Sequence, residues 1–173
     1  TKFREDPIYL DPRHKDLGAR LITNLEKLHL SLKLLELKSS NLDEYYSVSN
    51  KLGIPQINTD KLQNNLFGIE CNLNELNGID FKKGCYVGQE NTARIKLKDK
   101  LSKRLFPVEV IEGDLSKDNI IHHENTELGK VLINNKFPFA IVKFKDKNFK
   151  FEKIFKCGSA SVKIKKPYWF KFD

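Results

Sequence analysis

The sequence predicts an α+β protein in which a mixed α/β region, residues 1–100, precedes a β-rich domain, residues 101–173. Two observations support this prediction. Before residue 100 the apolar residues recur with helical spacing between Gly and Pro breaks, whereas beyond it they gather in short runs rich in β-branched and aromatic residues. With 39% hydrophobic residues, the 173 residues can bury a core in one domain or two small ones.

The first elements are expected to be extended and then helical. Residues 7–24 are predicted as extended chain with a turn, because Pro12 disfavours helix in the residue before it and Gly18 interrupts the next segment. Residues 25–38 are ambiguous, since their leucines fit both a helical stripe and the alternation of a strand. We favour the helix.

Residues 41–52 predict a clearer helix. Ser40 or Asn41 can cap its start, and Gly53 can end it before Pro55. A second short helix is predicted at residues 73–76, ended by an Asn-Gly pair, and a third is predicted to begin at about Gln89.

The β-rich domain is predicted from four apolar runs separated by turn-forming residues. Such short strands at this spacing are typical of a small barrel or a sandwich. The runs are residues 105–111, 130–133, 139–144 and 160–164.

Composition excludes several classes of protein. Lys and Arg number 31 against 23 Asp and Glu, but this +8 charge is dispersed, and direct nucleic-acid binding is not expected. No apolar run approaches the ~20 residues that span a bilayer, so no membrane partner is expected. Three widely spaced cysteines without a C-x-x-C pair fit a reducing, intracellular compartment. Because the chain starts at Thr1 and has no Met, we expect a fragment of a longer protein.

No metal site is predicted. His122 and His123 are adjacent, so on a strand they would point to opposite faces, and a surface loop is the expected place for them. The aromatic residues Tyr168–Phe170 and the pair Tyr45-Tyr46 could form a lid or stack on a ligand, but packing in a core is favoured for them.

The stretch of residues 78–94 carries the candidate chemistry. Gly84 and Gly88 bracket three residues, which permits a tight backbone path that would expose a side chain between them. Cys85 would then precede a helix N-terminus, with lysines nearby, and both features favour the thiolate. A buried structural cysteine is the alternative, because free Cys is among the most buried residue types.

The octapeptide Lys83–Glu90 resembles the K-G-C-[FY]-x-G-Q-E signature of YgfZ-type folate-binding proteins, relatives of the glycine-cleavage T-protein. Five further segments resemble landmarks of that family and occur in the family's order. They are D-P-R with L-G-x-R at residues 11–20, G-I-P at 53–55, E-x-N-L at 70–73, G-I-D-F at 78–81 and K-R-L at 103–105.

This resemblance implies an incomplete T-protein-like folate-binding domain over residues 1–100 and an antiparallel β-barrel over residues 101–173, with about the first hundred residues of such a protein absent. Family members bind tetrahydrofolate and support assembly or repair of iron–sulfur enzymes, including enzymes of tRNA modification. The resemblance makes Cys85 the key reactive residue. It makes residues around that cysteine the shape-determining part of the site, namely Lys83, Gly84, Tyr86, Gly88, Gln89, Glu90 and Arg94.

The resemblance leaves alternatives open. Ser49 stands where the family usually has an Arg near folate, and Gly68 stands where a proline is common. A tetrahydrofolate-dependent aminomethyltransferase of the T-protein kind is the second hypothesis, although T-proteins lack the cysteine signature; an RNA-contacting module is the third. The expected partners are folate and iron–sulfur enzymes or their assembly machinery. The expected location is the cytoplasm of a bacterium, or the mitochondrial matrix in a eukaryote.

Overall fold

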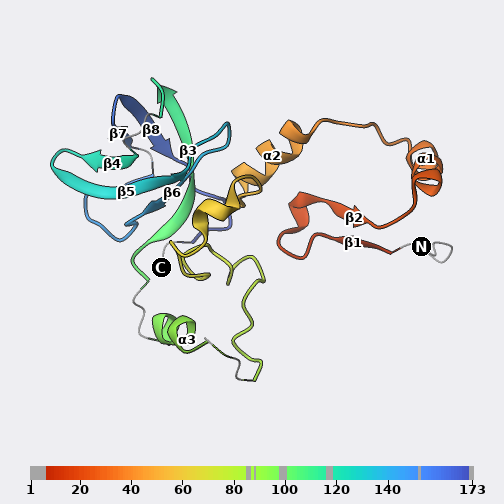
Figure 1. Cartoon of the computed structure of the whole chain (residues 1–173), viewed down its shortest axis with the longest axis horizontal. Helices are drawn as coiled ribbons and strands as arrows, with labels where there is room; N and C mark the ends of the chain where they lie inside the picture. Colours follow the sequence, from red (N-terminus) through yellow and green to blue (C-terminus); the bar gives the residue numbers. More distant parts are fainter. Residues whose placement is uncertain are drawn as a thin grey trace.

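The computed structural model describes residues 7–84, 87, 89–97, 101–115, 119–151 and 153–171. A β-barrel and an N-terminal arm lie at opposite ends of the molecule, with helix α2 (Leu42–Lys51) between them (Figure 1). Helix α3 (Gln89–Leu97) lies to one side, below the barrel in that view.

Six antiparallel strands of the described chain close the barrel in the order β3-β6-β5-β4-β7-β8. Strand β3 is the longest. Its first part, Arg104–Pro107, pairs with β6, and its second part, Val108–Glu112, pairs with β8. The strands are β3 (Arg104–Glu112), β4 (Ile120–His123), β5 (Thr126–Ile133), β6 (Phe139–Val142), β7 (Ile154–Cys157) and β8 (Ala160–Ile164).

The main hydrophobic core fills the barrel. Phe106 is fully buried and makes edge-to-face contacts with three other aromatic rings, those of Phe144, Phe151 and Phe170. Such pairs add about 0.5–1.5 kcal/mol each beyond the area they bury. Phe170 belongs to the C-terminal tail, so the tail contributes a buried side chain to the core.

The sequence predictions for this region are largely confirmed. All four predicted runs are strands, and of the two predicted architectures the structure has the barrel. The placement of His122 and His123 in a surface loop was wrong, because both lie in β4, where the register shifts between Ile121 and His122. This β-bulge interrupts the regular alternation of side chains between the two faces of β4 at the histidine pair.

The N-terminal arm consists of β1 (Ile8–Leu10), a 3₁₀ turn η1 (Lys15–Leu17), β2 (Ala19–Leu21) and α1 (Leu25–Leu34). The strands β1 and β2 pair only with each other within the described chain. Asn24 caps α1 by accepting a hydrogen bond from the Lys27 amide at 2.8 Å. The predicted extended segment and the helical alternative for the leucine-rich segment are both confirmed.

Asp11 is the one buried charged residue of the arm among those described. Its carboxylate accepts hydrogen bonds from Arg13 Nε and Nη2 and from Arg20 Nε at 2.8–3.0 Å. Chiefly because of the side-chain hydrogen bond from Arg13, the pKa of Asp11 lies well below its usual range. The D-P-R and L-G-x-R segments therefore form one polar cluster that closes the β1–β2 connection.

Helix α2 begins and ends where the sequence predicts. Asn41 caps it through the Glu44 amide, and Gly53 follows its end with φ +71°. A Cβ atom at Gly53 would lie 2.7 Å from Pro167 Cγ, so this position needs glycine for space as well as for conformation. The C-terminal tail is further fixed there by a 2.8 Å hydrogen bond from Trp169 Nε1 to the Leu52 carbonyl.

Residues 67–78 form a series of turns, so the predicted helix at residues 73–76 was wrong. Asn72 and Asn77 both adopt left-handed backbone angles, φ +62° and +58°, and interrupt helical geometry at each end of the short run. The turns instead cover β3, because Leu105 N donates to the Glu70 carbonyl at 2.9 Å.

Candidate functional site

The signature segment lies between the turns that cover the barrel and helix α3. Lys83 and Gly84, at its start, are exposed, as is Val87. Three residues predicted for the site, Cys85, Tyr86 and Gly88, lie outside the described residues. The roles given to these residues therefore stay predictions.

Helix α3 starts at Gln89, directly after the signature glycine, as the sequence predicts. Glu90 is in its first turn, where a carboxylate is favourable beside the positive end of the helix, and Arg94 is in its last turn, where a cation is favourable. Both side chains are exposed. Glu90 and Arg94 are four residues apart, so they lie on the same face of the helix. Arg94 can therefore approach the signature residues only along the face that carries Glu90.

The approach to the signature is anchored on the barrel core. Ile79 and Phe81 pack against that core together with Ile95 from α3. Lys96 Nζ lies 3.6 Å from the centre of the Phe81 ring, a cation–π contact between the two ends of the segment. The chain that precedes the signature and the helix that follows it thus meet on the same apolar surface.

A buried polar cluster joins the turns of residues 67–78, which precede the signature, to the start of β3. Asn72 is fully buried and donates from Nδ2 to the Leu105 carbonyl at 2.7 Å. Its Oδ1 accepts from Arg104 Nη1 at 3.0 Å, and the same Nη1 lies 2.6 Å from Glu75 Oε1. Asn72 and Arg104 belong to segments that resemble family landmarks, so their joint role is to fix the turns of residues 67–78 on the first residues of β3.

Arg104 was not predicted as a site residue, because the K-R-L landmark marks only the start of the β-rich domain. Its guanidinium also lies 5.4 Å from the Phe170 ring and 5.9 Å from the Phe144 ring. Only the pairing of a turn at residues 70–75 with a strand thirty residues later brings these groups together. The arginine is therefore a positioning residue for the segment that carries the signature.

The two described cysteines differ from the expectation for Cys85. Burial, followed by the charge of Glu70, raises the pKa of Cys71 to about 11, so this thiol stays protonated at neutral pH. Cys157 lies in β7 and is fully buried in the main core. Neither is in the electropositive, exposed setting that makes a thiol nucleophilic.

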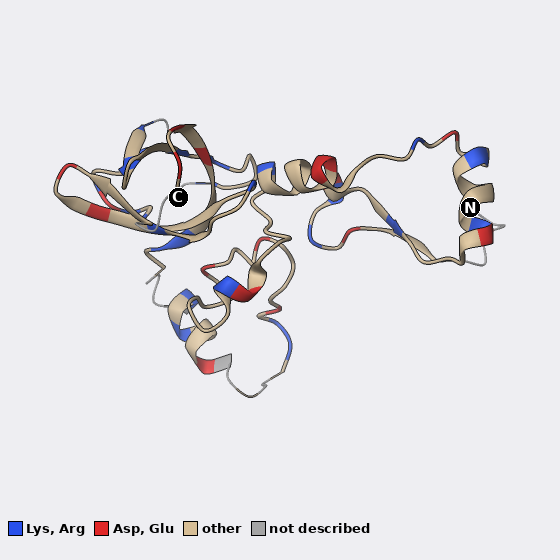
Figure 2. Cartoon of the chain, turned by 45° about the horizontal axis from the view of Figure 1, so that its top comes forward, with Lys and Arg blue, Asp and Glu red and all other residues tan. Residues whose placement is uncertain are grey.

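Charge is spread over the whole molecule. Figure 2 shows Lys and Arg on the barrel, around α3 and along the arm, interleaved with Asp and Glu. The dispersal expected from the sequence is thus seen in the structure. Around the signature, the described cations are Lys82, Lys83, Arg94 and Lys96, against Asp80 and Glu90.

Ser49, at the position where an arginine was expected to face folate, points inward. It is fully buried, and its hydroxyl donates to the Ile54 carbonyl at 2.5 Å. The serine joins the end of α2 to the Gly53–Pro55 segment. An arginine at this position would lose the hydroxyl's hydrogen bond to Ile54, and in the described conformation its charge would be placed at a fully buried position.

Other sequence candidates are resolved as packing or as polar contacts. Tyr45 Oη accepts hydrogen bonds from Arg13 and Gln56, and Tyr46 contacts the Phe137 ring. Tyr168 is exposed, and its hydroxyl donates to Asp16 at 2.6 Å.

Among the described residues no group of three or more His, Cys, Asp or Glu could hold a metal ion. In the same part of the chain, no helix is both long and apolar enough to cross a membrane.

Comparison with known proteins identifies homologues. No family model matches the chain. It is 34% identical over 115 residues to the "Iron-sulfur cluster assembly factor IBA57 homolog, mitochondrial" of Dictyostelium discoideum, which covers 66% of this chain and 28% of that protein. The mouse IBA57 factor is 36% identical, in an alignment that covers 64% of this chain and 30% of the mouse protein. The human IBA57 factor is 35% identical, in an alignment that covers 59% of this chain and 28% of the human protein. In these alignments the chain spans less than a third of each relative.

The names of these relatives bear on two predictions. Each relative is named as an iron–sulfur cluster assembly factor, in agreement with the iron–sulfur role implied by the signature. Each is also named mitochondrial, which agrees with the location expected for a eukaryotic source.

Proposed function

We propose that this chain is part of a mitochondrial iron–sulfur cluster assembly factor, in which residues 83–90 present Cys85 as a reactive thiolate. The observation that carries the proposal is the similarity, at 34–36% identity over about 100–115 residues, to relatives named for this role. The complete octapeptide of the resembling family adds to it.

Three features of the described residues support a reactive role for the signature segment. The flanking residues Lys83, Gly84 and Val87 are exposed, so the segment reaches solvent. Helix α3 begins at Gln89, four residues after Cys85 in the sequence, and its N-terminus is the positive end of the helix dipole. Phe81, before the segment, and Lys96, after it, are in cation–π contact, so the chain on both sides of the segment is held together.

Folate binding belongs to the same proposal. Tetrahydrofolate would lie beside residues 83–90, with Arg94 near it, and the chain would supply only part of the site. The arm is consistent with such incompleteness, because its leucines are largely exposed and the relatives extend well beyond the matched part. Further polypeptide of the full-length protein would cover the arm and complete the folate site.

Complementation of an iron–sulfur maturation defect tests the cysteine. Cys85→Ala in the full-length protein is expected to abolish complementation while the protein accumulates normally. Cys71→Ala is the matched control, because that thiol stays protonated at neutral pH, and it is expected to complement. Full complementation by Cys85→Ala would refute the reactive role.

Calorimetry with tetrahydrofolate tests the second half of the proposal. The 173-residue chain is expected to bind weakly or not at all, and the full-length protein is expected to bind. Tight binding by the 173-residue chain alone would show that the site is complete within it.

A further inference from the structure

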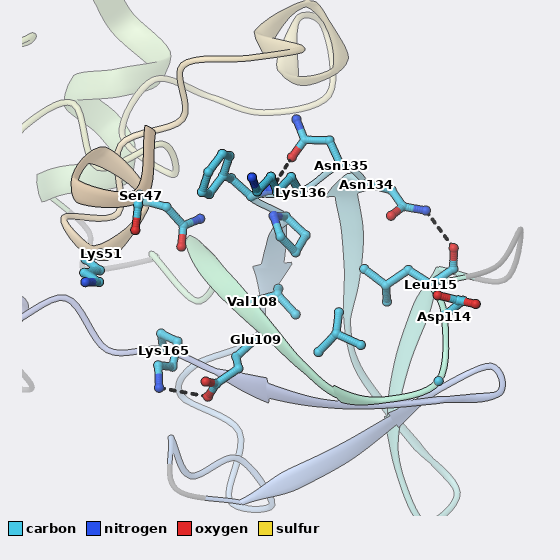
Figure 3. A pocket seen from close by; sticks show the side chains of 15 residues that line it. Ser47, Lys51, Val108, Glu109, Asp114, Leu115, Asn134, Asn135, Lys136 and Lys165 are labelled. Atoms are coloured by element: carbon cyan, nitrogen blue, oxygen red, sulfur yellow. Dashed lines mark hydrogen bonds and ion pairs between the residues drawn. The ribbon is translucent and has the colours of Figure 1, made fainter. Parts of the chain in front are cut away.

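A groove between α2 and the barrel has features of a ligand site, and no residue of the signature segment lines it among those described. Its volume is about 600 Å³, within the usual range for small-molecule sites. One wall is the second half of α2, the floor is Val108–Val110 of β3, and the other wall is the β5–β6 turn, residues 134–138 (Figure 3).

The groove exists because the β5–β6 turn is held away from β3. Lys136 pairs with Asp43 of α2 at 2.5 Å, Asn135 donates to the Asn58 side chain at 3.0 Å, and Phe137 contacts the Tyr46 ring. These contacts direct the turn toward α2. Strand β6 therefore covers β3 only as far as Val108, whose amide donates to the Pro138 carbonyl at 2.9 Å.

Beyond Val108, no backbone of the described residues pairs with β3 on its β6 side. Backbone groups of successive strand residues point to alternate sides. Val108 N bonds toward β6, whereas the Pro107 carbonyl accepts from Lys165 N on the β8 side. By this alternation the N–H and C=O of Val110 point to the β6 side, into the groove.

Asn50 also lines the groove, but its Nδ2 atom is buried and has no hydrogen-bond partner among the described residues. An atom without accessible surface cannot be reached by a ligand in an open groove. The backbone N–H and C=O of Val110 are therefore the hydrogen-bonding groups that the edge offers to an occupant.

The charges of the groove are separated along it. Figure 3 shows Lys51 and Lys165 on one side of the opening and Asp114 on the other. Lys165 pairs with Glu109 at 2.8 Å, but both side chains are nearly half exposed, and such pairs are weak and easily exchanged. The remaining charge, Lys136, is directed to Asp43.

We propose that this groove binds a zwitterionic ligand of dipeptide size, which adds to the edge of β3 at Val110 as a short antiparallel strand. Its carboxylate lies at Lys51 and Lys165, beside the start of the open edge, and its ammonium lies at Asp114, beyond the end of β3. The ligand backbone pairs with the N–H and C=O of Val110. This proposal is independent of the role of Cys85 and of folate.

Titration of the isotope-labelled 173-residue chain with L-alanyl-L-alanine, followed by amide NMR, tests the proposal. The Val110 backbone amide is expected to shift with saturation. N-acetyl-alanyl-alanine and alanyl-alanine amide each lose one ionic contact and are expected to bind about tenfold more weakly.

Two substitutions assign the ends of the ligand. In Lys51→Gln, amidation of the ligand carboxylate should no longer weaken binding, whereas acetylation of the ligand amine should still weaken it. Asp114→Asn should show the opposite pattern. Both side chains are exposed, and Lys130→Gln, on an exposed part of β5 outside the groove, is the matched control that should change neither. Absence of saturable shifts at Val110, or equal binding of the free and blocked dipeptides, would show a solvent-filled groove only and overturn the proposal.

Discussion

The barrel and the N-terminal arm of this chain use apolar residues in opposite ways. In the barrel, large side chains such as Phe106, Phe139 and Phe155 are at most 2% exposed. In the arm, Leu25, Leu30 and Leu34 of α1 are 62–82% exposed, and α1 has no buried residue. One part of the chain forms its core from its own residues, and the other does not.

The difference shows which forces hold each part. The barrel is stabilised by burial and aromatic packing, which require contacts between residues far apart in sequence. The arm is stabilised mainly by local features, namely the Asn24 cap, the β1–β2 pairing and the Asp11 cluster. Its contacts with the rest of the chain are mostly polar, such as Arg13 with Tyr45 and Asp16 with Tyr168. An isolated two-stranded sheet and a ten-residue helix are marginal in water without tertiary packing.

The largest expected effect is in the barrel core. Phe106→Ala removes a fully buried ring and its contacts with three others, and should lower the free energy of unfolding by about 3–5 kcal/mol. Leu30→Ala, at an exposed position of α1, is the counterpart in the arm and should change it by less than about 0.5 kcal/mol. Urea unfolding followed by Trp169 fluorescence measures both.

Equal losses for the two variants would contradict the contrast between the regions. Such a result would mean that the leucines of α1 are buried in the 173-residue chain.

A smaller effect is expected where the turns join the barrel. Asn72→Ala leaves the Leu105 carbonyl and an Arg104 donor without their partner and places alanine at φ +62°, which together should cost about 3 kcal/mol. Asn72→Gly removes the same hydrogen bonds without the backbone strain, so it should cost about 1 kcal/mol less. A loss for the alanine variant no greater than for the glycine variant would exclude a contribution from backbone strain.

The sequence predicted the barrel better than the turns that lie on it, for a physical reason. The β-rich runs such as residues 105–111 carry a local signal, whereas β4 is short and broken by a bulge at His122. A short helix was predicted at residues 73–76 within these turns, because the left-handed Asn72 before it is stabilised by Leu105 and Arg104, contacts that local propensity does not encode.

The smallest expected effect is the acid response of the arm. Because its folded-state pKa is lowered, the Asp11 carboxylate stabilises the arm fully above its unfolded pKa of about 4, and this contribution is lost as the pH falls further. Protection of the β1 and β2 amides against exchange, taken relative to the intrinsic rate at each pH, should therefore fall below about pH 4, before the barrel opens. Asp11→Asn should remove this pH dependence, and its persistence in that variant would exclude Asp11 as the source.

The candidate site could be predicted only in part. Gly84, the helix start at Gln89 and the nearby lysines are local features, and the described ones are where the sequence placed them. The anchoring of the segment by Phe81, Lys96 and Arg104 could not be predicted, because it depends on contacts with the barrel core. The reactivity of Cys85 is still a prediction.

The central claim is that one cysteine of this chain is reactive, and thiol labelling against pH tests it most directly. Cys85 should react at or below pH 7, Cys71 should react appreciably only as the pH nears its pKa of about 11, and Cys157 should react only on unfolding. An ordinary pKa near 8.5 for Cys85, or slower labelling than that of Cys71 at neutral pH, would contradict the account.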